Sequence, residues 1–591
     1  DRVFEPEPRE PANAPPGPAA APRGRALDMA LFALVFGEQI LCGFPQSAYI
    51  CGLTYGAFAA FRVFSKPTSE TPWRTRLAWL GGIGAAALFA AALGAVVLFP
   101  LSAAAAISDR VGSLGWTWAT ELAYWPRNVL TFIVPYINGD ISDNSYIGPP
   151  FFWEDYGYVG ILTLLFAVYG AARERRRPIV RFVALAALLA YFCVLGRATP
   201  VFRVIYTVVP GISLFRFPTR FLIVVELGLA LLAAIGLTRF RSDLARRWPS
   251  PSYVPAILAC VVCALTCLDL CIHQPRQNPM VAARDWLNPP AAVAVLHHGT
   301  SAPRTFTPRH RDLHRDAFEE ANGWSDVQPY FRMRDLLDPN TGGVFWNTPS
   351  ADCYDAIAPR WYVDVWGSDS REISLMGLST SVDADARVTH LDPVAANLFR
   401  TYGVTDVLSR YAEAGASLPL IYHDADVYIY GVPGAARVRF VSAARYVETD
   451  REAAQRLLSP QFDPTREALL HDVPAERRRS SFESAAVGQA AISREDSREI
   501  VIEADASADG FLLLADTYYP GWTAAIDGAV VPTYRADLSI RAVPFPKGRH
   551  EVRLDYEMPG LTRGLQVSLF ALSGLLIWIA LAVQAKRKPA R

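Results

Sequence analysis

Charged side chains are scarce in this chain of 591 residues. Asp, Glu, Lys and Arg make up only 19% of it, against about 25% in a typical soluble protein. Basic and acidic residues number 57 each, so the formal net charge is zero. That balance excludes a strongly basic nucleic-acid-binding protein, and we expect no nucleic acid as a partner. The 51% of hydrophobic residues exclude a disordered chain.

Motifs of several soluble enzyme classes are also missing. We find no P-loop, no dinucleotide-binding fingerprint and no serine nucleophile elbow. All nine histidines lie at or beyond position 273, so the apolar N-terminal half has no imidazole for a metal or a general base. His310 and His314 could share a helical face near Asp312, but no further ligand matches them. Metal dependence therefore stays open.

Cysteine is rare outside the apolar segments. Of eight cysteines only Cys353 lies in the polar part of the chain, which excludes a disulfide within that part. Cys260 and Cys263 have the spacing of a metal or redox pair, but they lie in an apolar helix at 252–272. We expect them to be small buried thiols packed against neighbouring helices.

Long apolar runs dominate what the sequence does contain. A helix needs roughly 20 apolar residues to cross a bilayer. On this basis we predict eight spans, at 27–43, 46–64, 77–105, 155–172, 178–196, 219–237, 252–272 and 562–584. The first seven form a membrane domain at 27–272, preceded by a Pro-rich linker or loop at 1–26. The fold class is a polytopic α-helical membrane protein with a large water-exposed part.

Basic residues predict the orientation of the spans. Arg and Lys gather in five clusters, at 23–25, 62–76, 173–177, 239–247 and 586–591. All five fall on one side if eight spans alternate, and the positive-inside bias makes that side cytoplasmic. The outer side then holds the loops 106–154 and 197–218 and the whole stretch 273–560.

Four arginines break this bias in the short outer stretch 197–220. They are Arg197, Arg203, Arg216 and Arg220. One interpretation is that they pair with carboxylates or carbonyls of the fold. The other is that they capture an anionic group such as a lipid phosphate, because a guanidinium can bond two oxygens at once.

The outer loop 106–154 combines aromatic and acidic residues. It holds four tryptophans and several acids, among them Trp125, Trp153, Asp140 and Glu154, with Asp155 directly following. Such residues suit either a sugar site or an aromatic belt at the membrane interface. Its apolar stretch 128–137 is too short to span a bilayer and is expected to be re-entrant or interfacial.

An ionisable residue, Glu226, lies well inside a predicted span. Glu226 is part of the sixth span, where a carboxyl group is costly and is a functional hypothesis by default. The alternative is a protonated or paired structural carboxyl.

The water-exposed part has two patterns. Residues 273–480 mix short strand and helix signals, and residues 481–560 alternate like an all-β domain. Asp527-Gly528 is a two-residue hairpin turn. We predict an extracytoplasmic mixed α/β region, then a small C-terminal β-sandwich. A final span and a basic cytoplasmic tail follow at 561–591.

Five stretches resemble one family of bacterial membrane proteins. They are GFPQSAYICGLTYGAFAAFR (43–62), YIGPPFFWEDYGYVGILTLLFA (146–167), GRATPVFRVIYTVVPGISLFRFPTRFLIV (196–224), LFRTYGVTDVLS (398–409) and YYPGWTAAIDGAVVPTYRADLSIRAVPFPKGRHEVRLDYEMP (518–559). In this order they are similar to the YfhO-type proteins of the GT-C glycosyltransferase superfamily. The resemblance implies a GT-C-like fold in a bacterial inner (plasma) membrane.

The same resemblance implies a sugar transferase. Such enzymes move a sugar from a polyprenyl-phosphate carrier to a cell-envelope glycan or polymer acceptor at the outer face. An acid in the first outer loop usually serves as base or metal ligand, but here that loop is only 43–46 and has no acid. We therefore expect that the chain lacks its N-terminal spans or is a form without activity.

Within this interpretation each site residue has an expected role. Arg216 and Arg220, with Arg197 more weakly, would bind the phosphate. Glu154 and Asp155 would assist as base, since a general base activates the acceptor hydroxyl. The remaining contacts to sugar or acceptor would come from Trp125, Trp153 and Asp140.

A non-enzymatic role is the alternative. The protein would then assemble the envelope or handle lipid-linked glycans, with its exposed domain binding a partner.

Overall fold

A computed structural model describes most of the chain. The described residues are 23–65, 71–108, 115–148, 152–154, 156–247, 253–273, 279–297, 303–324, 326–337, 339–353, 357–368, 373–478 and 487–587. They form two compact units. The helical unit comprises 1–103, 110–279 and 560–591, and the β-rich unit comprises 104–109 and 280–559. The predicted linker at 1–26 lies outside the described residues up to position 22, and α1 already begins at Arg23.

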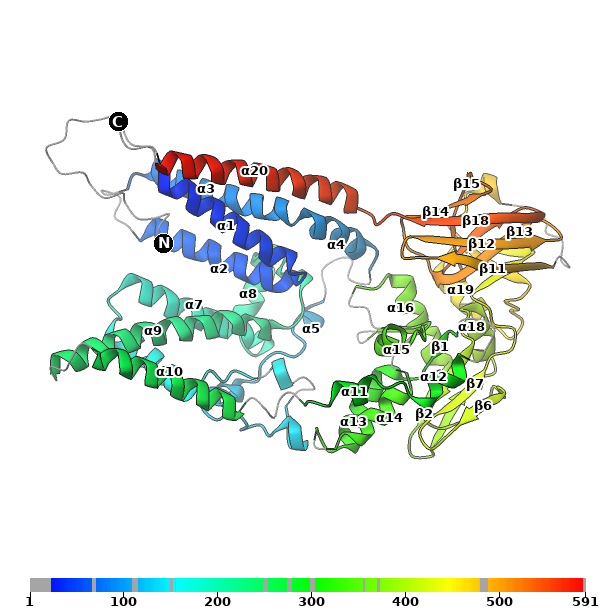
Figure 1. Cartoon of the computed structure of the whole chain (residues 1–591), viewed down its shortest axis with the longest axis horizontal. Helices are drawn as coiled ribbons and strands as arrows, with labels where there is room; N and C mark the ends of the chain where they lie inside the picture. The colour runs from blue at the N-terminus through cyan, green and yellow to red at the C-terminus, as the bar shows by residue number, and fades with distance from the viewer. Residues whose placement is uncertain are drawn as a thin grey trace. The chain divides into compact units, whose positions relative to one another are not determined.

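The helical unit is built from apolar helices joined by short loops (Figure 1). Its main helices are α1 (Arg23–Leu41), α2 (Pro45–Phe64), α3 (Trp73–Leu93), α4 (Ala95–Ile107), α6 (Ile161–Arg173), α7 (Pro178–Val194), α9 (Leu222–Arg247), α10 (Val254–His273) and α20 (Leu561–Arg587). Among the described residues, four segments are long and apolar enough to cross a membrane: Trp73–Leu93, Pro218–Arg247, Ala256–His273 and Leu561–Gln584. They suggest a membrane-associated protein. Three further apolar helices, α4, α6 and α7, are shorter.

The predicted third span, 77–105, is wrong as a single helix. It breaks at Gly94 into α3 and α4, and a Cβ on Gly94 would lie 2.4 Å from Cγ2 of Ile40. Ser568 of α20 binds the backbone at the break, because its hydroxyl donates to the carbonyl of Leu93 (2.8 Å) and accepts from the N–H of Val96 (3.0 Å). A break in an apolar helix needs such partners, since lipid offers none.

Helix α9 packs closely on both α6 and α7. A Cβ on Gly236 would lie 1.9 Å from the carbonyl oxygen of Phe166, and one on Gly228 would lie 2.7 Å from Cβ of Ala187. Small residues permit such close backbone approach between apolar helices. Tyr169 also donates to Asp243 (2.8 Å), so α6 and α9 run in the same direction and their arginine-rich C-terminal ends lie together.

Helix α10 contradicts the expectation for the thiols. Cys260, Cys263, Cys267 and Cys271 are all exposed rather than packed between helices. None of the residues in the apolar window of α10 is buried in the structure. The helix contacts α6 and α9 only lightly, so its thiols face away from the rest of the unit.

The β-rich unit contains two sheets that pack face to face. The six-stranded sheet has the order β8-β13-β17-β16-β10-β9, and the five-stranded sheet has the order β11-β12-β18-β14-β15. Their strands are β8 (Val438–Val441), β9 (Ala443–Val447), β10 (Glu467–His471), β11 (Gly488–Glu495), β12 (Glu499–Ala506), β13 (Gly510–Thr517), β14 (Trp522–Ile526), β15 (Ala529–Val531), β16 (Tyr534–Ala536), β17 (Ile540–Phe545) and β18 (Gly548–Tyr556). The inner faces meet through alternating apolar side chains such as Phe440, Ile502 and Val552.

Smaller elements complete the β-rich unit. Its helices are α11 (Ala283–Leu287), α12 (Ala291–Leu296), α13 (Leu313–Glu320), α14 (Gln328–Asp335), α15 (Pro339–Trp346), α16 (Arg360–Trp366), α17 (Leu375–Ser379), α18 (Ala395–Thr401) and α19 (Asp450–Leu457). The strands β1 (Thr305–Phe306), β4 (Asp406–Ser409), β7 (Tyr428–Gly431) and β6 (Leu420–His423) form one small sheet. The strands β2 (Thr380–Asp383), β3 (Val388–Leu391) and β5 (Ala412–Ala414) form another.

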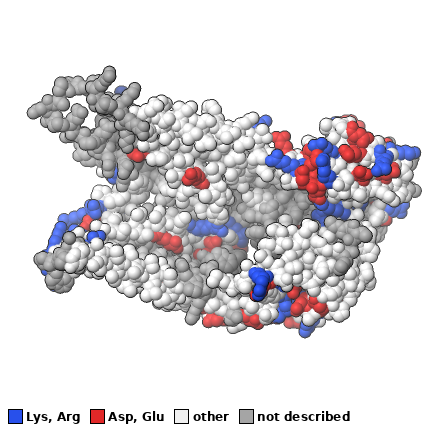
Figure 2. Space-filling model, viewed as in Figure 1, with Lys and Arg blue, Asp and Glu red and all other residues white. Residues whose placement is uncertain are grey.

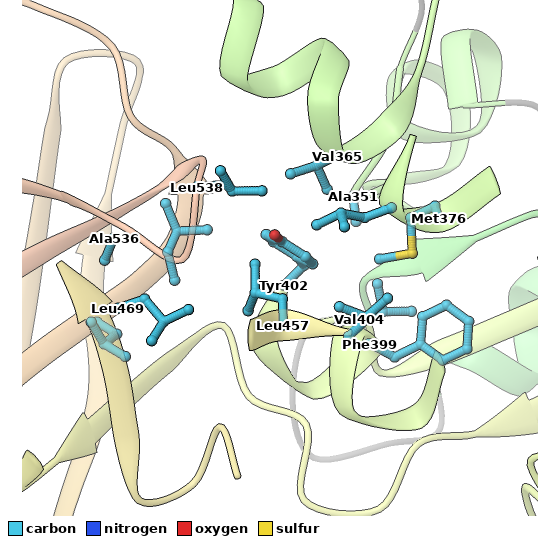
Figure 3. Packing of buried hydrophobic residues seen from close by; sticks show 14 of the residues in the cluster. Ala351, Val365, Met376, Phe399, Tyr402, Val404, Leu457, Leu469, Ala536 and Leu538 are labelled. Carbon is cyan, nitrogen blue, oxygen red and sulfur yellow. The ribbon is translucent and has the colours of Figure 1, made fainter. Parts of the chain in front are cut away.

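The predicted boundary between 480 and 481 does not divide the sheets. Strands β8, β9 and β10 precede it, yet within the six-stranded sheet β8 pairs with β13 and β10 pairs with β16 from the other side, while β9 pairs with β10. The outer face of this sheet is covered by the helical segments of 360–402. Figure 3 shows Leu469, Ala536 and Leu538 of the sheet side facing Tyr402 and Val365. One core therefore joins the predicted α/β region to the predicted sandwich.

Charge is distributed differently over the two units. On the face drawn in Figure 2, charged side chains are sparse over α1, α3 and α20 and crowded over the two packed sheets. This is the division that the apolar runs of the sequence predict.

Candidate functional site

Three loops of the helical unit meet at the N-terminal end of α9. They are the turn before α2, the short 3-10 helix Phe152–Glu154 and the stretch 210–221 that leads into α9, and a fourth segment, 116–121 with the short helix α5 (Trp116–Ala119), joins them. Because α6 and α9 run in the same direction, this end lies opposite their arginine-rich ends. We call the cluster formed here the arginine site, made of Arg216, Arg220, Glu121 and Glu154 and the aromatic rings Phe44, Trp118 and Phe217.

Arg216 is held by one carboxylate and two rings. Its Nε lies 3.1 Å from Oε2 of Glu121. Its guanidinium carbon lies 5.1 Å from the centre of the Trp118 ring and 4.3 Å from that of Phe217. The Arg216 side chain is 16% exposed, whereas that of Glu121 is 46% exposed. The carboxylate therefore stands on the solvent side of the pair.

Arg220 repeats this arrangement with a second carboxylate. Its Nη2 donates to Oε1 of Glu154 at 3.3 Å, and Thr219 donates to Oε2 of the same carboxylate at 2.8 Å. The guanidinium lies 4.6 Å from the centre of the Phe44 ring and 5.4 Å from that of Phe217. The buried Nε of Arg220 has no hydrogen-bond partner within the described residues.

A strained turn places the two arginines side by side. Phe217 has a φ of 63°, in the left-handed region that costs energy for a side chain of this size. Gln46 stabilises the turn, because its amide donates to the carbonyl of Arg216 (2.6 Å) and lies 3.4 Å from that of Phe217. Tyr49, one turn further along α2, donates to the carbonyl of Pro210. The result is that the Phe217 ring contacts both guanidinium groups.

A small pocket opens beside Arg216. It has about 240 Å³ of empty space, part of it open to solvent, and is lined by Gln46, Tyr49, Phe202, Phe215, Arg216 and Phe217 among others. The enclosed part of this space has room for about one water molecule.

The other predicted site residues lie apart from this cluster or outside the described residues. Arg197 is exposed, and the described part of the chain gives it no ion pair. Trp125 is 37% exposed and stacks with Arg127 at 4.5 Å. Asp140 is buried and accepts from the N–H of Ser142 at 2.8 Å, so its carboxylate caps a 3-10 turn. Asp155 and the side chain of Trp153 lie outside the described residues.

The apolar stretch 128–137 forms short turns and no spanning helix. Asn128 and Thr131 point inward, where Thr131 donates to the Asn128 carbonyl at 2.7 Å. The residues that point outward are large and apolar, namely Val129, Leu130, Ile133, Val134 and Ile137, each at least 43% exposed. Their pattern fits contact with an apolar surface such as the membrane interface.

Glu226 lies one turn into α9 and is half-buried. Within the described residues its carboxylate has no hydrogen bond or ion pair. A paired carboxyl, one of the alternatives for Glu226, is therefore not seen among the described residues. Among the described residues, no three His, Cys, Asp or Glu side chains lie close enough together to hold a metal ion.

The sequence analysis did not assign Glu121 or the three aromatic rings to the arginine site, nor Gln46, which holds its turn. Glu121 is one of several acids in its loop, and nothing in a spacing of 95 positions links it to Arg216. Gln46 lies in the Gly-Phe-Pro-Gln segment, which is part of the family resemblance, and this could have indicated that Gln46 contributes to the site. The structure brings three of the five quoted stretches together at this site, through Gln46, Glu154 and Arg216.

Comparisons of the chain with models of protein families, with curated proteins and with solved structures gave no match.

Proposed function

We propose that the protein is a membrane glycosyltransferase of the GT-C type that resembles the YfhO-type family. It would move a sugar from a polyprenyl-phosphate carrier to a cell-envelope acceptor at the outer face of a bacterial inner membrane. The observation that carries the proposal is the arginine site, where two guanidinium groups and two carboxylates share one aromatic cluster beside a small pocket.

In this proposal the arginines receive the phosphate of the carrier. Each guanidinium keeps donors beyond the one that contacts its carboxylate, and the rings of Trp118, Phe44 and Phe217 hold the planes in place. A phosphate between Arg216 and Arg220 would gain charge as the sugar leaves. Fixed positive charge at that point lowers the barrier.

The carboxylates supply the base. An acceptor hydroxyl oxygen attacks the anomeric carbon, and its proton passes to a carboxylate of the site. The bond between the anomeric carbon and the phosphate oxygen breaks, and its electron pair stays on the polyprenyl phosphate. Glu154 is the better candidate for the base because it is held by two donors, Thr219 and Arg220. Glu121 is the more exposed carboxylate and faces solvent.

Substitution of each arginine tests the proposal. Arg216→Ala and Arg220→Ala should each lower kcat/KM by about 10²-fold or more with a polyprenyl-phosphate-linked hexose as the donor, measured as release of polyprenyl phosphate. Arg203→Ala is the matched control, since Arg203 is exposed and stacks on Trp116 at 5.2 Å outside the arginine site. Unchanged turnover in both site variants would refute the phosphate assignment.

A non-enzymatic role in envelope assembly or lipid-linked-glycan handling is the second candidate. The observation that favours it is that each arginine is already neutralised by a carboxylate. This alternative expects binding of the same lipid without release of polyprenyl phosphate. It expects no turnover in either the wild type or Glu154→Gln, whereas the enzyme proposal expects the wild type to turn over and Glu154→Gln to bind the lipid and lose turnover.

A further inference from the structure

A second group of arginines converges in the β-rich unit, on a single aspartate. Asp516 lies near the end of β13, where the register with β17 shifts between Leu514 and Thr517. This irregularity is a β-bulge, which commonly re-aims a side chain. It brings the carboxylate to Arg541 of β17 and to Arg304 and Arg437, which directly precede β1 and β8.

The carboxylate of Asp516 binds all three guanidinium groups. Arg304 Nη1 donates to its Oδ1 at 2.8 Å, and Arg541 Nη2 donates to its Oδ2 at 3.1 Å. Arg437 donates to both oxygens, from Nε at 2.9 Å and from Nη2 at 2.7 Å. These contacts hold the pKa of Asp516 well below its usual range despite its burial, through the Arg437 hydrogen bonds and the surrounding positive charge.

The cluster has more positive than negative charge. A second carboxylate, Glu495 at the end of β11, accepts from Arg437 Nη1 and Nη2 at 2.7 Å each. Three guanidinium groups thus face two carboxylates, and one positive charge is unmatched. Burial, together with the like charges of Arg437 and Arg304, lowers the pKa of Arg541 to about 10.

The innermost arginine is buried and keeps free donors. The Arg541 side chain is 3% exposed and lies over the Trp522 ring at 4.1 Å from its centre. Its Nε and Nη1 have no hydrogen-bond partner among the described residues, and the same holds for Nε of Arg304. Buried guanidinium donors normally find an acceptor, because leaving them unpaired is costly.

Exposure rises from the inside of the cluster outward. Asp516 is 16% exposed, Arg437 is 32% exposed and Glu495 is 40% exposed. Glu495 therefore holds the outermost position, where its two oxygens bind the Arg437 fork as an external oxyanion would. Glu495 belongs to the five-stranded sheet, whereas Asp516 and Arg541 belong to the six-stranded sheet. Arg437 directly precedes β8 of that sheet, and Arg304 directly precedes β1 of the four-stranded sheet.

We propose that Arg304, Arg437 and Arg541 form an oxyanion-binding site, for a phosphate or carboxylate group, in which Glu495 occupies the outer position until the ligand displaces it. Asp516 holds the three guanidinium groups in place and does not leave. The site does not rest on the proposed glycosyltransferase activity, and its ligand is recognised by its charge and its pair of oxygens alone.

Thermal unfolding of the purified full chain in detergent tests this site, with inorganic phosphate as the probe and chloride at matched ionic strength as the reference. Phosphate should raise the Tm of the wild type, since a ligand that binds only the folded state stabilises it. Glu495→Gln removes the competing carboxylate, so the apparent phosphate affinity should rise about fivefold. Glu503→Gln is the matched control, because it breaks the exposed pair of Glu503 with Arg549 elsewhere on the same sheet and should leave the affinity unchanged.

The double variant Glu495→Gln with Arg437→Gln assigns the effect to this cluster. It should lose the phosphate-dependent rise in Tm, and this loss distinguishes the site from phosphate bound at the arginine site of the helical unit. Dimethyl phosphate and glucuronate in place of phosphate separate a phosphodiester or a carboxylate ligand from free phosphate. The proposal is wrong if none of the three anions raises the Tm of Glu495→Gln beyond chloride, or if the rise persists without Arg437. The cluster would then be an ion-pair network that only joins the two sheets.

Discussion

The two arginine clusters differ in how the charges are shared. In the helical unit Arg216 and Arg220 each have a carboxylate of their own and lie on aromatic rings at the end of α9. In the β-rich unit one carboxylate, Asp516, serves three arginines between strands. We therefore expect that removing one carboxylate changes the stability of the protein by different amounts in the two clusters. The loss of one carboxylate in the helical unit leaves one unpaired arginine, whereas the loss of the shared carboxylate in the β-rich unit leaves three unpaired arginines.

The largest expected effect is therefore at Asp516. Asp516→Asn should destabilise the protein by about 3–5 kcal/mol, because three guanidinium groups lose their shared anion in a mostly buried place. Chemical denaturation followed by circular dichroism measures this loss. Phosphate should restore part of the lost stability, and this recovery would further distinguish this cluster from that of the helical unit. A loss below about 1 kcal/mol would show that the removal of one carboxylate affects stability no more in this cluster than in that of the helical unit.

The helical unit should be more sensitive to volume than to charge. Gly236→Ala should destabilise it by about 1–3 kcal/mol, since the added Cβ overpacks the contact between α9 and α6. The structure places that atom 1.9 Å from the carbonyl oxygen of Phe166. Gly56→Ala is the matched control, because a Cβ on Gly56 of α2 meets nothing within 4 Å. Thermal unfolding in detergent measures both, and equal Tm values for the two variants would contradict the packing argument.

A smaller, pH-dependent effect is expected at a third arginine contact of the β-rich unit. Asp450 accepts from Arg535 Nη2 (2.8 Å) and lies 3.3 Å from Nδ1 of His471. The hydrogen bond with His471 and then the Arg535 contact lower the pKa of Asp450 from 3.8 to about 2. A lowered carboxyl pKa stabilises the fold above the unfolded pKa, and this stabilisation is lost as the pH falls from about 4 to about 2.

Asp450→Asn isolates this contribution. Its stability relative to the wild type should be lower near neutral pH and should approach the wild-type value near pH 2. The difference should not exceed about 1 kcal/mol, because the Asp450 side chain is 46% exposed. Urea denaturation at a series of pH values measures this difference in the free energy of unfolding. A difference that grows toward low pH would contradict the prediction.

The smallest effect on stability is expected at the arginine site of the helical unit. Glu121→Gln should change the free energy of unfolding by about 0–1 kcal/mol, since the Glu121 carboxylate is 46% exposed. Any difference from the wild type should shrink in high salt, which screens exposed pairs. Thermal unfolding at low and high ionic strength is the measurement. A loss as large as that of Asp516→Asn would show that the arginine site also holds its unit together.

Local patterns were enough to predict much of the fold. The apolar runs at 219–237, 252–272 and 562–584 correspond to α9, α10 and α20. The Asp527-Gly528 turn is confirmed, because both residues have positive φ (49° and 84°) between β14 and β15. These features depend on neighbours in the sequence, namely apolar length and the backbone freedom that a two-residue turn requires.

Features that depend on distant partners were predicted less well. The break at Gly94 lies in a continuous apolar run, and its partners Ile40 and Ser568 come from other helices. The composition changes near position 480, but β8 and β10 pair with strands beyond that point because sheet pairing does not follow sequence order. The exposure of the thiols of α10 could not be predicted for the same reason, since the sequence of an apolar helix does not show which of its faces a neighbouring helix covers.

The candidate site, too, could be predicted only in part from the sequence. The sequence by itself determined that arginines, acids and aromatic residues lie in the segments before α6 and α9, and that apolar helices follow them. Only the tertiary structure decided that Glu121 meets Arg216, that Glu154 meets Arg220 and that Gln46 holds the turn between the arginines. The physical reason is that composition and turn geometry act within a few residues of the chain. An ion pair or a hydrogen bond requires two atoms within about 3 Å, and only the packing of the helices brings residues this far apart in the sequence to that distance.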